Sequence, residues 1–177
     1  VRSRLEAGAA GDLPETPDAS HPAFGRVRTH VLADGMTAVS AARDVAREAG
    51  YETLVLSSRL RGEAREAAKL HAGVAEECRA TGNPVDPPAV VLSGGELTVT
   101  VRGEGEGGPN QEFALAGAID LPAGAVLAAV DTDGRDGASD AAGALVDSET
   151  VTDVAAARDA LDDNDAGGYL GDRDARI

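Results

Sequence analysis

The chain has 177 residues, with 31 acidic against 16 basic side chains, a formal net charge of −15 and only 2% aromatic residues. Without a basic patch to neutralise phosphates, a duplex nucleic-acid partner is excluded, and no apolar run is long enough to span a bilayer. The length allows one domain with a core of Ala, Val and Leu, or one domain and a tail.

Lys69 is the only lysine among the basic residues. An acidic surface with almost no lysine is typical of proteins in a high-salt cytoplasm, where salt screens the self-repulsion, so we expect a halophilic protein. The single cysteine, Cys78, excludes an intramolecular disulfide, and no signal peptide opens the chain. These features predict a cytoplasmic setting. Because the first residue is Val1, we expect a processed product or a fragment of a longer protein.

Residues 1–27 combine glycine, proline and scattered charge, and are expected to form a linker or the end of a preceding domain. Beyond them, hydrophobic periodicity predicts strands that alternate with helices. Strands are expected at 28–33, 51–56, 89–93, 97–102 and 125–130. Helices are expected at 36–49, 63–81, 110–119 and 150–161. The expected N-caps are Asp34, Asn110 and either Thr150 or Thr152, and the expected helix ends are Gly50 and Gly82.

The alternation predicts an α/β fold, a layered α/β/α sandwich with a mixed, largely parallel sheet. The strand–helix–strand order over 28–56 predicts a parallel βαβ unit, and the closely spaced strands at 89–93 and 97–102 predict an antiparallel part. We expect one domain over 28–165 and a truncated acidic tail over 166–177. The helix over 63–81 is expected to bury one face, formed by Ala64, Ala67, Leu70, His71, Val74, Ala75 and Cys78.

The first candidate site is the loop Ser93-Gly94-Gly95-Glu96, which directly follows a predicted strand. Ligands of open α/β sheets bind beyond the carboxyl ends of strands, and the two glycines allow close approach of the backbone. Glu96 would then be an acidic group facing the ligand. The alternative is a hairpin turn with a solvated Glu96.

The second candidate site is the segment 103–112 (GEGEGGPNQE), which ends at a predicted helix start. Its backbone N–H groups can face an anion, helped by the helix dipole, and Asn110 and Gln111 add neutral donors. Glu104 and Glu106 would repel a phosphate unless a divalent cation lies between them, and no lysine completes a Walker A motif. The alternative is a mobile surface loop followed by a capped helix.

The third candidate site is the loop 131–140 (DTDGRDGASD), whose carboxylates suit Mg²⁺ or Ca²⁺. It lacks the glutamate that an EF-hand needs, and a set of Asx-turns is the alternative. His71 and Cys78 are expected to be packed core residues rather than a catalytic pair. His21 and His30 have no partners at zinc-ligand spacing.

Taken in order, the motifs Ser93-Gly94-Gly95-Glu96, 101–112 and 131–143 resemble the MOFRL domain, the carboxy-terminal part of two-domain glycerate 2-kinases that are often named hydroxypyruvate reductases. The resemblance covers roughly residues 28–165 and suggests a fragment of a haloarchaeal-like member. It implies ATP-dependent phosphorylation of D-glycerate to 2-phosphoglycerate with Mg²⁺. The active site would lie in a cleft shared with an amino-terminal domain of the same protein, so the chain alone is expected to be inactive. The resemblance is also compatible with a homodimer.

The resemblance also implies roles for particular residues. Catalytic roles are implied for Glu96, Asn110, Gln111, Glu112 and Arg102. Substrate or phosphate contacts are implied for Gly94, Gly95, Gly107, Gly108, Thr132 and Gly134, and Mg²⁺ ligation for Asp133 and Asp136. The family pattern has an arginine where this chain has Pro109, so either Arg102 or Arg135 is expected to supply that charge.

Two other functions stay open from the sequence. A hydroxypyruvate reductase needs an NAD(P)H site, and no Gly-x-Gly-x-x-Gly follows a predicted strand with an acidic residue about twenty positions on. A non-catalytic cation-binding domain would instead use the acidic loop 131–140.

Overall fold

The computed structural model describes residues 1–177, which divide into two compact units, Val1–Leu32 and Ala33–Ile177. The first unit contains α1 (Arg2–Ala9) and a 3₁₀ helix (Pro22–Arg26) whose first turn is capped by the side chain of His21. None of the helices combines the length and the apolar character that crossing a membrane requires. The domain boundaries expected at residues 28 and 166 stay predictions.

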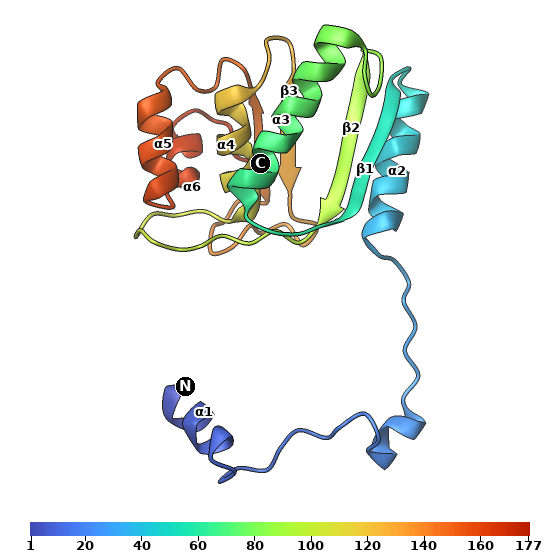
Figure 1. Ribbon diagram of the computed structural model, residues 1–177, viewed down its shortest axis with the longest axis vertical. Coiled ribbons are helices and arrows are strands. Elements are labelled where there is room, and N and C mark those ends of the chain that lie inside the picture. Colours follow the sequence, from blue (N-terminus) through green and yellow to red (C-terminus); the bar gives the residue numbers. More distant parts are fainter. The chain divides into compact units, whose positions relative to one another are not determined.

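The second unit alternates helices and strands, which confirms the predicted α/β class (Figure 1). Its elements are α2 (Gly35–Glu48), β1 (Glu52–Leu60), α3 (Ala64–Thr81), β2 (Ala89–Gly95), α4 (Pro109–Asp120), β3 (Val126–Val130), β4 (Gly143–Asp147), α5 (Val154–Asp162) and α6 (Ala166–Gly171). β1 and β2 pair in parallel and β3 and β4 pair antiparallel, as two two-stranded sheets. Both kinds of pairing that the sequence predicts are therefore present.

Helices lie on both faces of the β1–β2 pair. Successive strand residues point to opposite faces, and on β2 the Ser93 hydroxyl reaches His71 of α3, while Gly94 lies against Val39 of α2. β1, α3 and β2 thus form a parallel strand–helix–strand unit with α2 covering the other face. The βαβ unit predicted over 28–56 is therefore replaced by one further along the chain.

The helix α4 is the centre of the unit. Its residues from Gln111 to Ala118 are all buried, because α3, α5, α6 and the β3–β4 pair pack around it. Alanines and Gly117 make this close packing possible: a side chain at Gly117 would collide with Leu127 of β3. The main hydrophobic core is built around this helix from small residues, as the composition predicts.

The helix ends follow local chemistry, with two corrections. Asp34 caps α2 in a capping box with Thr37, and these hydrogen bonds hold the pKa of the Asp34 carboxyl below its ordinary value. Gly82 ends α3 in the left-handed conformation, as predicted. The predicted N-cap Asn110 is wrong, because Gly108 caps α4 and Pro109 takes the first helical position. The predicted threonine cap of the helix after 150 is also wrong, since Asp153 caps α5.

Two predicted strands are absent. Residues 28–33 are exposed and irregular, because no neighbouring strand offers them hydrogen bonds. Residues 97–100 show the expected alternation of burial, but Val101 is exposed, and only Thr98 forms a bridge, in parallel with Glu63 at the entrance to α3. The predicted antiparallel pair at 89–102 is therefore wrong, and the antiparallel pairing lies between β3 and β4.

Some features of the unit were not predicted. β4 and the buried helix α6 were not expected, and α6 lies within the stretch 166–177 that was expected to be an acidic tail. His71 and Cys78 are buried as predicted, but Leu70 is 57% exposed. The buried row of α3 contains Ala68 and Ala72 instead, because small side chains let α3 approach α4 closely.

Candidate active site

The three loops singled out from the sequence lie at one end of the second unit. β1 and β2 are parallel, and Figure 1 shows that they and β3 all end at the edge where α3 and α4 begin. We call this the loop edge; it comprises Ser93–Glu96, the segment 102–111 and the loop 131–140. Strand carboxyl ends and helix amino ends meet here, which is the usual place for ligands in α/β proteins.

The first loop depends on its two glycines. A side chain at Gly94 would press against Val39 of α2, and one at Gly95, where φ is +152°, would collide with the backbone of Leu60. The two residues thus let the ends of β1 and β2 lie side by side. The Glu96 side chain is exposed, and its backbone N–H donates to the Leu60 carbonyl at 3.0 Å.

A buried histidine holds the start of this loop. His71 Nδ1 lies 2.7 Å from the Ala67 carbonyl, which can only accept, so this nitrogen carries the proton. Nε2 is then the acceptor for the Ser93 hydroxyl, 2.8 Å away. The imidazole also packs edge-on against Phe113 of α4. His71 is therefore a packed, hydrogen-bonded residue, as predicted, and it links α3, β2 and α4.

The glycine-rich segment is fastened to the turn between α5 and α6. The N–H groups of Arg102 and Gly103 donate to Asn164 Oδ1 at 2.6 and 2.9 Å. The N–H groups of residues 104 and 105 donate to Asp163, and that of residue 106 donates to Asp165. Five successive backbone donors are therefore engaged within the protein, so this stretch is not the free cradle of N–H groups that the sequence predicts.

The amino end of α4 already holds an anion, which is the carboxylate of Asp136. Its Oδ1 accepts from the backbone N–H and side-chain amide of Asn110 at 2.9 and 3.0 Å. Its Oδ2 accepts from the corresponding groups of Gln111 at 2.8 and 3.0 Å. Asp136 is fully buried and thus completes the helix start. Ser139, also buried, accepts a further bond from the Gln111 amide at 2.7 Å.

Glu112 forms a buried ion pair rather than facing solvent. The Arg65 guanidinium of α3 donates Nε to Oε1 at 2.8 Å and a terminal N–H to Oε2 at 3.2 Å. The hydrogen bond with Glu112 raises the pKa of Arg65 above its ordinary value. Arg65 also reaches Asp162 at 3.3 Å. Asn164 Nδ2 lies 3.4 Å from Oε2 of Glu112, so this pair is connected to the turn that fastens the glycine-rich segment.

The loop after β3 has exposed carboxylates around the buried Asp136. Thr132, Asp133 and Gly134 are exposed, and Asp133 Oδ1 accepts from the N–H of Arg135 at 2.9 Å. Asx-turns are thus present, as the alternative interpretation expects. Across the chain, no cluster of three or more His, Cys, Asp or Glu side chains is arranged to hold a metal ion.

The structure brings the second and third loops together through Asp136, Asn110 and Gln111. Gly137 also approaches the backbone of Gly107 and Gly108 closely. No hydrogen bond joins Ser93–Glu96 to these two loops. The catalytic, phosphate-binding and metal-binding roles expected for the individual residues stay predictions. For Asp136, a role in metal binding would require its present hydrogen bonds to break.

Sequence reasoning missed Asn164. It combines a φ of +57° with 9% exposure, and its side chain bonds the backbone of both Arg102 and Gly103. Asparagine adopts this conformation more readily than most residues, but nothing in the sequence marks this asparagine among the acidic residues around it.

Replacing Asn164 by glycine tests this connection, because glycine keeps the backbone conformation and removes only the side chain. We expect amide hydrogen exchange at Arg102 and Gly103 to become roughly tenfold or more faster. Asp174→Gly is the matched control, since Asp174 also has a positive φ but is exposed. Equal exchange rates in the two variants would contradict the role assigned to Asn164.

The chain is similar to known proteins in both sequence and fold. Residues 89–177 match the model of the MOFRL family. A glycerate 2-kinase of Pyrococcus horikoshii is 37% identical over 154 residues, which cover 85% of this chain and 34% of that protein. A protein of Agrobacterium vitis named putative hydroxypyruvate reductase is 46% identical over 136 residues, covering 75% of this chain and 30% of that protein.

The fold is similar to a solved structure as well. A crystal structure of glycerate kinase from Thermotoga maritima superimposes with a TM-score of 0.80 at 34% sequence identity, covering 85% of this chain and 38% of that one. The chain thus spans about a third of the length of the relatives it matches.

Proposed function

This chain belongs to the MOFRL family, and we propose that it forms one wall of the active site of an ATP-dependent glycerate 2-kinase. The substrate would be D-glycerate and the product 2-phosphoglycerate. The other wall would come from an amino-terminal domain of the same protein, because the matched glycerate 2-kinase is about three times as long as the part shared with this chain.

The observation that carries the proposal is a group of unpaired arginines in the loop edge and beside it. Arg59 and Arg61 stand at the end of β1, Arg102 precedes the glycine-rich segment and Arg135 follows β3; all four are exposed and none forms an ion pair. In a chain of net charge −15, unpaired cations at the edge where ligands bind favour anionic substrates. Glycerate and ATP are both anions.

Arginine suits phosphoryl transfer because its planar guanidinium binds phosphate oxygens in pairs and stays charged. We assign Arg102 and Arg135 to stabilising the transferred group, in place of the family arginine that Pro109 replaces. Glu96, exposed beside the end of β2, is our candidate for accepting the proton of the attacking hydroxyl.

Asn110, Gln111 and Glu112 are proposed to act mainly by position. Asp136 holds the first two and Arg65 holds the third, so the start of α4 is rigid. The partly exposed Asn110 keeps its side-chain carbonyl oxygen free of any hydrogen bond, so it can accept one from the substrate. Gly107 and Gly108 let Gly137 pack against this backbone. Rigid placement of this kind contributes to catalysis by holding reacting groups in line.

The residues of the third loop fit Mg²⁺ in part. Mg²⁺ keeps several waters and binds one or two carboxylates together with substrate phosphates. Asp133 is exposed with one carboxylate oxygen free of hydrogen bonds, whereas both oxygens of Asp136 are engaged. We therefore assign the ion to Asp133, with Thr132 and Gly134 beside the phosphates. A bound Mg²⁺ would neutralise phosphate charge near Glu104 and Glu106.

The test is an assay of the chain joined to the amino-terminal part that completes the relatives, with D-glycerate, ATP and Mg²⁺. We expect ADP release, and we expect Arg102→Gln to lower kcat by roughly a hundredfold, as for loss of one group that stabilises transition-state charge. Arg79→Gln, in the last turn of α3, is the control and should leave kcat unchanged. Absence of ADP release would refute the kinase.

The hydroxypyruvate reductase is retained as a second candidate because the Agrobacterium relative carries that name. A dinucleotide site at the start of α4 would have to accommodate a pyrophosphate where the Asp136 carboxylate now lies, which makes it the weaker candidate. NADH oxidation that depends on hydroxypyruvate, in the same joined protein, would reverse this ranking.

A further inference from the structure

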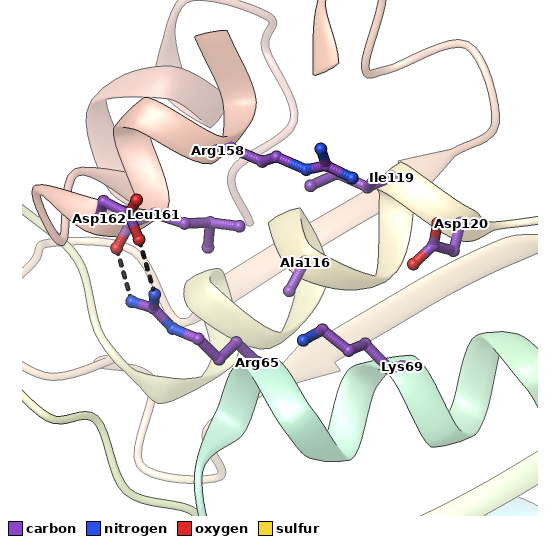
Figure 2. Close-up of a pocket in the computed structure, with 8 residues that line it drawn as sticks. All are labelled: Arg65, Lys69, Ala116, Ile119, Asp120, Arg158, Leu161 and Asp162. Carbon is purple, nitrogen blue, oxygen red and sulfur yellow. Dashed lines mark hydrogen bonds and ion pairs between the residues drawn. The ribbon is translucent and has the colours of Figure 1, made fainter. Parts of the chain in front are cut away.

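A hollow lies between α3, α4 and α5 (Figure 2). Its cavity volume is about 350 Å³, at the lower end of the range for small-molecule sites. Three cationic side chains line it: Arg65 and Lys69 from α3 and Arg158 from α5. We call it the cation pocket. None of its lining residues belongs to the loop edge, so its function does not depend on the kinase proposal.

The wall between the cations is apolar. Ala116 and Ile119 come from α4, and Leu161 comes from α5 (Figure 2). A ligand here would therefore rest a small hydrocarbon part on this surface while its charged group faces the cations. This combination of apolar lining and a few polar groups is what small-molecule sites have in common.

Two of the three cations are available to a ligand. Lys69, the only lysine of the chain, pairs only with Glu66, at 2.7 Å, and both side chains are more than half exposed. Such exposed pairs are weak, so a ligand competes easily for the ammonium group. Arg158 forms neither an ion pair nor a hydrogen bond, although acidic residues are about twice as numerous as basic ones in this chain.

The acidic lining limits what the pocket accepts. Asp162 is engaged by Arg65 at 3.3 Å, but Asp120, at the carboxyl end of α4, has no ion pair. This carboxylate, together with the negative end of the helix dipole, disfavours a ligand of high negative charge. It favours a single negative charge accompanied by a hydrogen-bond donor, which Asp120 accepts.

We propose that the cation pocket binds a small hydroxycarboxylate. The carboxylate lies between Lys69 and Arg158, the short carbon chain rests on Ala116 and Ile119, and the hydroxyl donates to Asp120. Arg65 is a fixed wall of the pocket because Glu112 and Asp162 already hold it. We expect a dissociation constant on the order of millimolar, as for a ligand of few atoms.

The experiment is a titration of the ¹⁵N-labelled chain with lactate, acetate and inorganic phosphate at constant ionic strength, followed by amide chemical shifts. Lactate has the hydroxycarboxylate chemistry without being the proposed kinase substrate. We expect saturable shifts at Lys69, Ile119 and Arg158, with lactate binding several times more tightly than acetate and phosphate binding least. Shifts confined to the loop edge would overturn the proposal while leaving the kinase proposal untouched.

Three variants sharpen the test. Lys69→Gln combined with Arg158→Gln should weaken lactate binding about tenfold, because both attractive charges are lost. Asp120→Ala should abolish the preference for lactate over acetate, since it removes the acceptor for the hydroxyl. Arg79→Gln, outside the pocket on α3, should bind as the unaltered chain does. Unchanged binding by the double variant, or a lactate preference that survives Asp120→Ala, would overturn the proposal.

Discussion

Replacing Asp136 by asparagine should lower the free energy of unfolding by about 2–4 kcal/mol, measured by urea denaturation. The buried carboxylate accepts four N–H bonds from the start of α4, and its charge interacts favourably with the helix dipole. Asparagine at this position has no charge, and its side-chain NH₂ group would face N–H donors of α4. Those donors would then lack an acceptor. The core helix would start from an incompletely satisfied end.

Asp133→Asn is the matched control for this variant. Asp133 lies three residues away in the same loop but is exposed, so the change should stay within about 0.5 kcal/mol. Comparable losses in the two variants would show that the Asp136 carboxylate is not the group that completes α4.

Replacing Arg65 by methionine should be still more costly, about 3–5 kcal/mol in the free energy of unfolding. The Glu112 side chain is only 3% exposed, and without Arg65 its carboxylate would remain buried with no cation beside it, keeping only the 3.4 Å contact from Asn164 Nδ2. The double variant Arg65→Met with Glu112→Leu should recover most of the loss, because an apolar pair removes the unpaired charge. Differential scanning calorimetry of the single and double variants measures both effects.

Lys69→Met serves as the control on the same helix, since it removes the exposed pair with Glu66 and should cost less than about 0.5 kcal/mol. If the double variant were no more stable than Arg65→Met, the loss would come from packing around Arg65 rather than from the unpaired Glu112.

The sequence could predict those helices and strands in which the spacing of apolar residues reflects which face is buried. α3, α4, β2 and β3 all lie where the spacing of apolar residues predicts them. The segment 97–102 shows the limit of this signal. Its alternation correctly places Leu97 and Val99 inward but not the exposed Val101, and alternation does not report whether another strand lies alongside. The same limit applies to 28–33, which has β-forming residues and no partner.

The candidate site shows a second limit. The sequence places Asp136 in a loop rich in carboxylates, and that composition is as suitable for a metal site as for a helix cap. Only the fold shows that the carboxylate lies against residues 25 and 26 positions earlier, at the start of α4. Likewise, Arg65 of α3 and Glu112 of α4 are 47 positions apart in the sequence, and no local pattern indicates that they form an ion pair.

The attachment of the glycine-rich segment to the turn after α5 determines which segments of this domain can be replaced by those of a relative. Backbone donors from 102–106 meet Asp163, Asn164 and Asp165, and the Gly167 N–H returns a bond to the Glu106 carbonyl at 2.7 Å. Side chains at Gly103 and Gly105 would collide with Asp163 and Asp165. The two segments therefore form one structural unit. A chimera that grafts the glycine-rich segment of a relative onto this chain would have to transplant residues 163–167 with it.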